Sequence, residues 1–491
     1  MTNTDTIQLA ADHLSRKYGT EIPTAYYSHV RTWRDWWRGY YKPFHSYQEL
    51  GLDNAPRQRE LFKMDMAKRV CEDWASILLN EKTTLTIDDR ASAEFIQGAD
   101  GDSGMGGVLG KNRFWSEANA LLERAFGYGT GAFVIRVENA STDGAGRVIA
   151  DEKSSVGIEY IDALGILPLG IRKNRITDCA FVSESSRLGK EYIYLETHTR
   201  DDRGIYVIEN EYFAVENGAL IKQPLPQGVA ERFDTGGGLP WFSLIYPNIT
   251  NNMTNQNGLG MSVFANAIDN LKGVDLAFNN FLRDLKLGGK KVFVNKKMTF
   301  QAESGITVTP DDVAQSLFQM IGDDVDFDAK QMIQEYNPAL RVEENKAAVQ
   351  SQLDYLSLKC GLGAHRYRFE SGIVKTATEY SGERQELVQH ASRHAIVIED
   401  ALLSLCRAIL YIGKAFCGAQ VDPETTITVN FEDGFIISEE DRQSKDMQLV
   451  QAGILNAWEY RVRHFGEDEE TARAALEGLQ SAAGNPFGFL E

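Results

Sequence analysis

Three short motifs in this chain contain residue types that could do chemistry. The first, Gly101-Asp102-Ser103-Gly104, repeats the four letters around the nucleophile of trypsin-like proteases. That nucleophile works only with a histidine and an aspartate placed beside it and an oxyanion hole, in an all-β scaffold. Because helical patterns and a run of glycines surround the motif here, we interpret it as a surface loop.

The second motif resembles a phosphate-binding loop and ends in Gly110-Lys111-Asn112. Such a loop needs G-x-x-x-x-G-K-[ST], in which the first glycine opens the turn and the hydroxyl holds magnesium. Met105 occupies the first glycine position and Asn112 the hydroxyl position. These departures exclude a nucleotide site at this loop.

The third motif is a pair of histidines, His390 and His394, which would share one face of a predicted helix as metal ligands do. No glutamate follows the first histidine, no third ligand is evident, and Arg393 lies between the two. We interpret the pair as a solvated helix face or a subunit contact. With no catalytic constellation elsewhere, the sequence predicts that the protein is not an enzyme and uses no metal or cofactor.

Composition narrows the class of protein further. The chain has 491 residues and a formal net charge of −19, which argues against a general nucleic-acid coat. The most apolar long helical segment, near 395–412, contains Glu399, Asp400 and Arg407, so we expect no membrane partner. No CxxC pair occurs, which predicts reduced, buried thiols rather than disulfides or zinc. The five scattered cysteines are Cys71, Cys179, Cys360, Cys406 and Cys417.

The segments that would position a functional site are predicted to be a mixture of helices and strands. An aromatic and basic segment at 31–44 has two interpretations. It could stack on nucleic acid or dock to a partner chain, or it could pack into a core or a neighbouring subunit, and packing is favoured. Residues 113–250 alternate helices with short strands and turn signals, which is typical of an antiparallel α+β body.

The second half of the chain carries the longest periodic segments. Residues 256–288 predict an amphipathic helix of about 27 residues that starts at Gly-Leu-Gly, and a basic strand follows. A helix capped at Thr309-Pro310-Asp311-Asp312 is expected within 306–326, and another helix at 341–360. A glycine-flanked basic loop at 361–378 leads into a helix of about 35 residues from Ala377 towards Phe416.

Taken in order, four of these segments resemble the portal proteins of long-tailed bacteriophages, of the type found in phages of Gram-positive hosts. They are 67–85, 257–294, 375–410 and 444–466. The resemblance implies an α+β portal fold with an α/β wing, a two-helix stem, a small αβ clip, a long helix after a tunnel loop, and a helical C-terminal crown. The implied divisions are 1–255 for the N-terminal arm and wing, 256–288 for the first stem helix, 289–340 for the clip, 341–360 for the second stem helix, 361–378 for the tunnel loop, 379–430 for the long wing helix and strand, and 431–491 for the crown-like segment.

The resemblance also implies a function. Portal proteins form a ring, typically dodecameric, at one capsid vertex, through which double-stranded DNA is packaged and ejected without sequence specificity. The implied partners are other copies of the chain, the DNA, the large terminase, head-completion or adaptor proteins, scaffold and the major capsid protein. The protein would be a virion component that is assembled in the host cytoplasm.

Candidate residues follow from this resemblance. In the first stem helix an apolar stripe near a 3.5-residue spacing suits packing between neighbouring subunits or within one subunit. The stripe comprises Phe264, Ile268, Leu271, Phe278, Leu282 and Leu285. Candidates for contact with DNA in the channel are Lys286, Arg366, Arg368 and Lys375, and candidates for partner docking on the clip are Lys290, Lys291, Lys296 and Lys297. The alternative for the loop cations is pairing with acids such as Glu370 or Glu379.

The acidic composition has a mechanical interpretation in this setting. A uniformly basic tunnel would hold a duplex tightly through counterion release and would oppose its sliding. An acidic wall with a few local cations would repel DNA over most of its length. Two other classes remain open from the sequence: a minor head or capsid protein without a channel, and a DNA-processing packaging enzyme.

Overall fold

The computed structural model describes most of the chain. The described residues are 6–50, 55–80, 83–99, 106–142, 148–149, 151, 153–254, 258–295, 318–321, 333–368, 377–431, 439–451 and 455–483. With 46% helix and 25% strand, the protein has the α+β class predicted from its sequence. Two compact units are present, one of Met1–Asn80 with Thr86–Thr428 and the other of Glu81–Leu85 with Val429–Glu491.

Two antiparallel sheets form the β part of the first unit. The larger has the order β12-β11-β10-β9-β8, with β13 paired to β11, and the smaller has the order β14-β4-β7. The strand bounds are β4 (Gly131–Glu138), β7 (Ser155–Asp162), β8 (Ile166–Arg172), β9 (Arg175–Arg187), β10 (Lys190–Arg200), β11 (Tyr206–Glu216), β12 (Ala219–Gln223), β13 (Arg232–Asp234) and β14 (Phe242–Ile245). Short pairs join β5 (Ser141–Thr142) to β6 (Val148–Ile149) and β3 (Thr84–Ile87) to β18 (Ile427–Asn430).

A buried ionic cluster connects the two sheets. Glu196 of β10 bonds His198 Nε2 at 2.7 Å and Arg136 Nη2 of β4 at 2.6 Å. Burial by itself would raise the pKa of Glu196, but the hydrogen bonds and charges of His198 and Arg136 outweigh it and lower that pKa. His198 Nδ1 lies 2.7 Å from the hydroxyl of Tyr206 on β11. Because every charge has a partner, the cluster is tolerated between the sheets.

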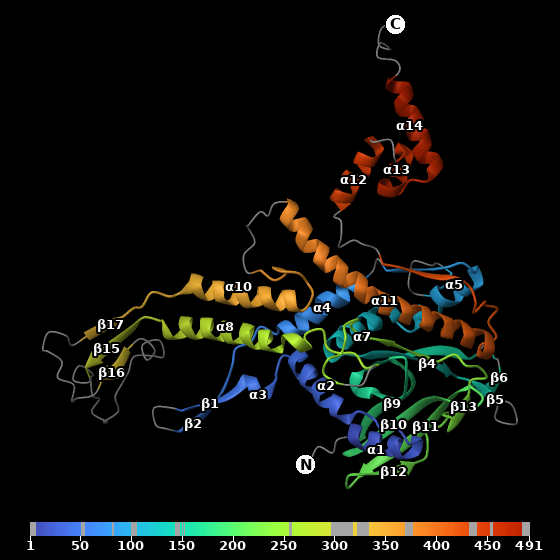
Figure 1. Cartoon of the computed structure of the whole chain (residues 1–491), viewed down its shortest axis with the longest axis horizontal. Coiled ribbons are helices and arrows are strands. Elements are labelled where there is room, and N and C mark those ends of the chain that lie inside the picture. The colour runs from blue at the N-terminus through green and yellow to red at the C-terminus, as the bar shows by residue number, and fades with distance from the viewer. Residues whose placement is uncertain are drawn as a thin grey trace, which may run out of the picture. The chain divides into compact units, whose positions relative to one another are not determined.

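Helices cover these sheets and complete the core of the first unit (Figure 1). They are α1 (Thr6–Tyr18), α2 (Thr24–Trp37), α4 (Met66–Leu78), α5 (Arg90–Gln97), α6 (Gly107–Lys111), α7 (Phe114–Tyr128) and α11 (Ala377–Phe416), with a 3-10 turn η1 (Ala163–Gly165). In the aromatic segment Trp33 and Trp36 are 1% and 2% exposed, so these two rings pack within the subunit, as the favoured interpretation predicted. The five cysteines are free and buried, as predicted.

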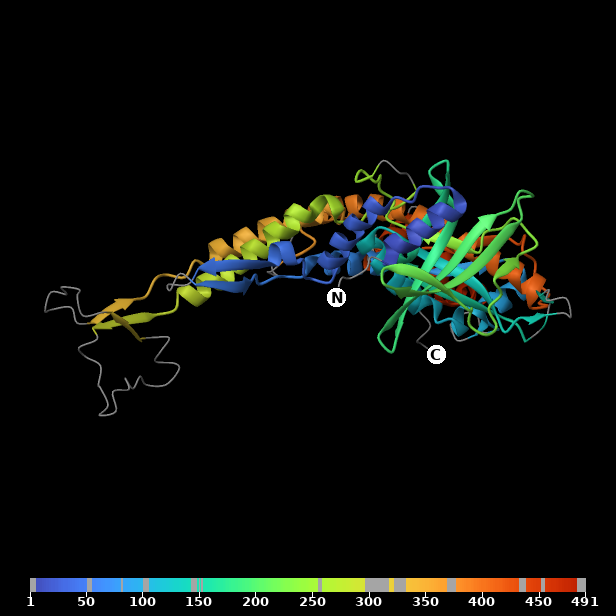
Figure 2. The same cartoon turned by 90° about the horizontal axis from the view of Figure 1, so that it is seen from below.

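Two antiparallel helices, α8 (Ile268–Leu287) and α10 (Val342–Lys359), lie side by side and lead to a small sheet (Figures 1 and 2). In that sheet β15 (Lys291–Asn295) pairs in parallel with β16 (Phe318–Ile321) and antiparallel with β17 (Ile333–Tyr336). The helix predicted within 306–326 is therefore wrong over Phe318–Ile321, where pairing with β15 outweighs the local helical pattern. Its other residues lie outside the described ranges.

The first of these helices starts later than the sequence predicts. A short 3-10 turn, η2 (Ala265–Ala267), precedes α8, which therefore begins at Ile268 rather than near 257. The backbone of Gly260 runs so close to that of Gly129 that a Cβ at Gly260 would collide with the Gly129 carbonyl. Thr130 Oγ1 accepts the Gly260 N–H at 3.0 Å, and Tyr26 donates to the Gly260 carbonyl at 2.8 Å. These long-range contacts hold the Gly-Leu-Gly segment outside the helix.

A slender arm lies along α8 on the side that faces away from α10. The arm comprises the described residues 41–50 and 55–64, with the one-turn helix α3 (Lys42–His45) and an antiparallel hairpin of β1 (Ser46–Leu50) and β2 (Pro56–Glu60). Figure 1 shows α8 between this arm and α10. The arm thus comes from the N-terminal region, although α8 follows more than 200 residues later.

The second unit consists mainly of three short helices. They are α12 (Glu439–Gln451), α13 (Ala457–Phe465) and α14 (Glu469–Ala483). Asn456 and Glu459 form a capping box at the start of α13, which satisfies backbone N–H groups that the helix leaves free. His464 Nε2 on α13 lies 3.0 Å from Asp446 Oδ2 on α12. Short helices in this region agree with the sequence prediction.

Candidate functional site

The contact between α8 and α10 is specified by a few polar and small residues. Asp284 on α8 accepts a hydrogen bond from Arg341 Nη2 at 2.7 Å and one from Asn345 Nδ2 at 3.0 Å. The bond from Arg341 is the main cause that lowers the pKa of Asp284. Further along the pair, Gly273 leaves room for the side chain of Gln352. The two helices are therefore held in one register, which a purely apolar seam specifies less well.

The predicted stripe on α8 does not form one uniformly buried face. Phe264, just before the helix, and Leu271 are buried, whereas Leu285 is 39% exposed. The other stripe residues, Ile268, Phe278 and Leu282, are half-buried. The fully buried face of α8 instead includes two polar residues, Asp275 and Asn279, which are 5% and 3% exposed.

Those two polar residues bind the arm. Asp275 Oδ1 accepts the N–H of Met64 at 2.8 Å, and Asp275 Oδ2 lies 3.0 Å from His45 Nε2. Asn279 Oδ1 accepts the N–H of Phe62 at 3.2 Å. His45 Nδ1 lies 2.8 Å from the backbone nitrogen of Tyr41 and 3.1 Å from the Tyr41 carbonyl oxygen, so both ring nitrogens are engaged in polar contacts. From the sequence, Asp275 is recognisable only as an acid that interrupts the apolar stripe, and Asn279 and the contact with the arm were missed. The signal was a polar spacing of four within the stripe.

The start of the basic loop after α10 is fixed by polar contacts. Gln350 Nε2 donates to the Tyr367 carbonyl at 2.7 Å, and His365 Nδ1 lies 2.9 Å from Asp354 Oδ1. Arg366 Nη2 lies 3.7 Å from Asp73 Oδ1 of α4, a carboxylate that is 5% exposed. Arg366 is therefore paired with an acid, although with a different one from the acids considered from the sequence.

Some of the remaining candidate cations are among the described residues and others are not. Lys286 is exposed at the end of α8, and Lys290 pairs with Glu335 of β17 at 2.7 Å, both side chains being about half exposed. Lys291 opens β15, and Arg368 Nε donates to the His365 carbonyl at 3.2 Å. Lys296, Lys297 and Lys375 lie outside the residues that the structure describes.

Comparison with known protein families gives one decisive match. A sequence model of the phage portal proteins of the SPP1 Gp6-like type matches residues 17–483 of the 491-residue chain. The chain belongs to this portal protein family. It matches no protein of curated description. The match confirms the family that the sequence resembles.

Family membership settles the coarser expectations. Portal proteins are structural components of the virion rather than enzymes. The described residues of this portal protein contain no group of three or more His, Cys, Asp or Glu that could hold a metal ion. None of the helices within the described ranges is both long and apolar enough to cross a membrane.

The chemical motifs have structural explanations where they can be seen. Residues 100–105, including the protease-like motif, lie outside the described ranges. Asn112, at the end of the loop that resembles a phosphate-binding motif, uses its amide to bind the carbonyls of Val108 and Val156 at 2.8 and 2.9 Å and accepts the Ile158 N–H at 2.9 Å. Asn112 therefore connects α6 to β7 through hydrogen bonds.

The interpretation of the two histidines as a solvated face or subunit contact is wrong for His394. This side chain is 2% exposed, its ring meets Trp74 and Phe126, and its Nδ1 accepts the N–H of Asn248 at 2.9 Å. Burial, assisted by the charges of His390 and Arg393, lowers the pKa of His394 to about 3. It is a neutral core residue, because the Trp74 face of α4 packs against α11 at this point.

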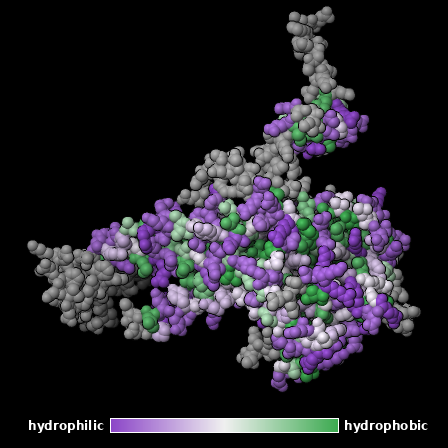
Figure 3. Space-filling view, viewed as in Figure 1, coloured by the Kyte–Doolittle hydropathy of each residue, from purple (hydrophilic) through white to green (hydrophobic). Residues whose placement is uncertain are grey.

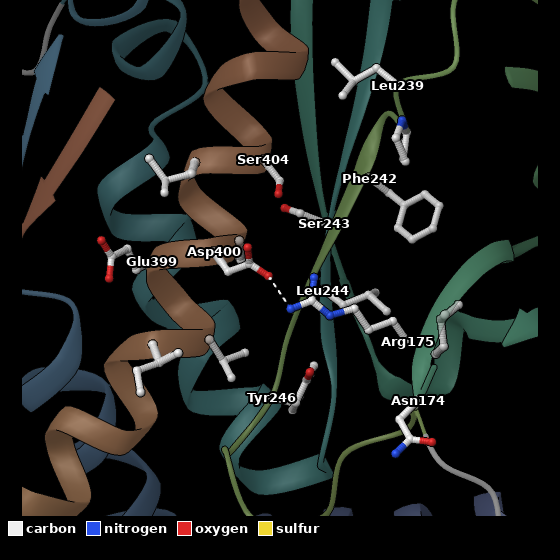
Figure 4. A pocket seen from close by; sticks show the side chains of 17 residues that line it. Asn174, Arg175, Leu239, Phe242, Ser243, Leu244, Tyr246, Glu399, Asp400 and Ser404 are labelled. Atoms are coloured by element: carbon white, nitrogen blue, oxygen red, sulfur yellow. Dashed lines mark ion pairs between the residues drawn. The ribbon is translucent and has the colours of Figure 1, made fainter. Parts of the chain in front are cut away.

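A hollow of about 490 Å³ lies between α11 and β14 of the portal protein (Figure 4). The Arg175 guanidinium bridges to Asp400 across it at 3.4 Å. The hydroxyls of Ser243 and Ser404 point toward each other, but no histidine or cysteine is among the described residues that line the hollow. Nothing here activates a serine as a nucleophile.

Proposed function

We propose that this portal protein assembles as a closed, dodecameric ring at one capsid vertex and that double-stranded DNA passes along the axis of the ring during packaging and ejection. The family match over residues 17–483 is the observation that carries the proposal. In this ring α8 and α10 form the stem, β15–β17 the clip, the loop that starts at Gly361 the tunnel loop, and α12–α14 the crown.

The surface of the helix pair supports self-association. Five large apolar side chains on α8 and α10 are between 39% and 56% exposed in the single chain, and Figure 3 shows apolar patches among hydrophilic ones over this region. These are Leu276, Leu285, Leu287, Tyr355 and Leu358. Apolar surface concentrated along two helices is a common mark of a protein–protein interface. Neighbouring subunits would cover it.

The charge of the chain supports passage of DNA rather than tight binding. The net charge is −19, and the described candidate cations Lys290 and Arg366 each pair with a carboxylate. Pairing lowers the attraction that such cations exert on phosphates. We propose that Lys286, Arg366, Arg368 and Lys375 make transient contacts with phosphates on a mainly acidic wall.

The small sheet β15–β17 is the proposed docking surface for the large terminase and, later, for head-completion proteins. Its exposed Lys290 and Glu335 offer exchangeable ion pairs, which suit partners that replace one another. Lys291, Lys296 and Lys297 belong to the same proposed surface. Scaffold and major capsid protein are the proposed partners during shell assembly in the host cytoplasm.

Electron microscopy of the purified full-length chain in negative stain tests the ring. We expect rings with a central hole, together with weak, sequence-independent duplex binding at 0.15 M salt. Monomers or shell-like sheets would favour a minor head protein without a channel. Cleavage of DNA in the presence of Mg²⁺ would favour a packaging enzyme, and tight duplex binding at that salt concentration would contradict the acidic-wall proposal.

A further inference from the structure

The β1–β2 hairpin lacks the partners that normally stabilise a hairpin. Within the described residues it is a two-stranded sheet with no third strand. All five residues of β2 are exposed, and the apolar side chains of Leu50 and Phe62 are 69% and 53% exposed. An isolated two-stranded hairpin is at best marginally stable in water, and an open strand edge is a template for pairing. The hairpin therefore presents a surface that is suited to a partner.

Polar contacts hold the base of this hairpin against α8, on a side of that helix that faces away from α10. The arm binds α8 through Asp275, Asn279 and Arg283, and Arg283 Nη2 lies 3.4 Å from Glu49 Oε1 of β1. The residues of α8 that meet α10 are Gly273 and Asp284. At roughly 100° of turn per residue, the centres of these two sets lie about 130° apart around the helix, so the arm and α10 contact different sides of α8. The arm, α8 and α10 follow one another in this order in Figure 1.

The outer side of α10, which faces away from α8, is acidic at its N-terminal end and apolar at its C-terminal end. Glu343 is 79% exposed and Glu344 is also exposed, whereas Tyr355 and Leu358 are 56% and 47% exposed. Ala347 and Ser351, which lie between them along the same side, are exposed and small. Such a face can receive an extended segment without steric conflict.

The hairpin carries basic and apolar residues, which complement the acidic and apolar residues of α10. Its strand β2 carries Arg57 and Arg59, and its apolar ends are Leu50 and Phe62. The local pairs on both surfaces, Arg59 with Glu49 at 3.2 Å and Glu343 with Lys346 at 3.2 Å, are solvent-exposed. Exposed pairs contribute little, so they can be exchanged for pairs across an interface.

We propose that the β1–β2 hairpin of one copy docks on the outer side of α10 in a second copy. Because the two surfaces lie on different sides of the stem, one copy can bind a neighbour on each side. Such a head-to-tail contact repeats until a ring closes. This inference rests on the proposed ring and names the residues that join its subunits.

A charge-reversal experiment tests the contact. We expect Arg57→Glu with Arg59→Glu to weaken ring assembly at least ~10-fold at low salt, and Glu343→Arg with Glu344→Arg to do the same, because like charges then face each other. Combining all four changes restores the opposite charges and should recover most of the assembly. The matched control, Arg172→Glu with Arg187→Glu, makes the same change in net charge at exposed positions of β8 and β9. Sedimentation velocity reads out the ring fraction.

Cross-linking tests the direction of the contact. The five native thiols are buried, so a short bismaleimide should react with cysteines introduced at the exposed Gln58 and Ala347. A chain that carries both Gln58→Cys and Ala347→Cys should give a ladder beyond the dimer. A mixture of the two single variants should give dimers only. Gln58→Cys with Ser186→Cys serves as the unlinked control.

The outcomes separate this inference from the proposed function. Rings that form normally in both charge-reversed variants and give no ladder would overturn the hairpin contact but leave the portal ring intact. Dimers formed by Gln58→Cys alone would indicate a hairpin-to-hairpin contact and would also overturn it. A wild-type chain that stays monomeric would overturn both proposals.

Discussion

Nε2 of His45 lies 3.0 Å from Oδ2 of Asp275, and this pair is the buried joint between the N-terminal arm and α8. Both side chains are buried. Both carboxylate oxygens are used, since Oδ1 accepts the N–H of Met64. The joint explains why α8 carries an acid on its buried side.

Replacement of this acid should be costly. Asp275→Ala leaves the Met64 N–H and the His45 ring N–H buried without acceptors, so we expect a loss of about 2–4 kcal/mol in the free energy of unfolding. Asp275→Asn keeps one acceptor and should lose less than half as much. Urea unfolding followed by tryptophan fluorescence measures both. Equal stability of Asp275→Ala and wild type would show that the joint does not hold the arm.

The backbone crossing at Gly260 should not tolerate a side chain. Gly260→Ala places a Cβ against the Gly129 carbonyl, so we expect a loss of about 3 kcal/mol or more, or failure to fold. Gly289→Ala is the matched control, because the nearest atom to its new Cβ is the Lys286 carbonyl at 3.8 Å. Thermal unfolding compares the two. A Gly260→Ala protein as stable as the control would contradict the close approach.

His394 should make stability depend on acidity. Its pKa is about 3 in the folded protein and 6.5 as a free side chain. Between these two pH values His394 is therefore protonated in the unfolded chain but neutral in the folded chain. Stability contributed by neutral His394 is therefore complete above pH 6.5 and falls by about 1.4 kcal/mol per pH unit as pH drops towards 3.

The variant His394→Gln isolates this contribution, because its amide oxygen can accept the same N–H from Asn248 and does not titrate. We expect its unfolding free energy to depend less steeply on pH than that of wild type between pH 6 and 4. The measurement is a series of urea titrations at matched ionic strength. Parallel curves for the two proteins would rule out a neutral buried His394.

The ion pair that crosses the hollow in Figure 4 should contribute little. Arg175 and Asp400 are 74% and 59% exposed, and an exposed pair is worth about 0–1 kcal/mol. We expect Arg175→Ala to change the free energy of unfolding by less than about 0.5 kcal/mol. A double-mutant cycle with Asp400→Ala measures the coupling, and a value above ~1.5 kcal/mol would mean that the pair is shielded from water.

Local periodicity predicted several elements well. The helix expected at 341–360 is α10, and the long helix expected from Ala377 towards Phe416 is α11, within one or two residues. Both have repeating apolar positions over many turns, which neighbouring residues alone define. By contrast, residues 318–321 form β16 because a strand from a distant part of the chain pairs with them.

The candidate site was predicted less completely, because its geometry depends on contacts between distant segments. The cations of the basic loop were recognised, but the acid beside Arg366 is Asp73, almost 300 residues earlier. The apolar stripe of α8 was recognised too, yet sequence could not show that its most buried side faces an arm from residues 41–64. Contacts of this kind leave no periodic pattern.

By itself the sequence determined the α+β class, the two long helices after residue 340, the buried reduced thiols and the order of segments that identifies a portal protein. These properties depend on composition and on residues close together in the chain. Only the tertiary structure decided that α8 begins at Ile268, that His394 is a neutral core residue, and that Asp275 joins an arm to the stem helix. Each of these depends on a contact with a distant backbone segment or side chain that excludes water at that position. No local sequence pattern specifies such a contact.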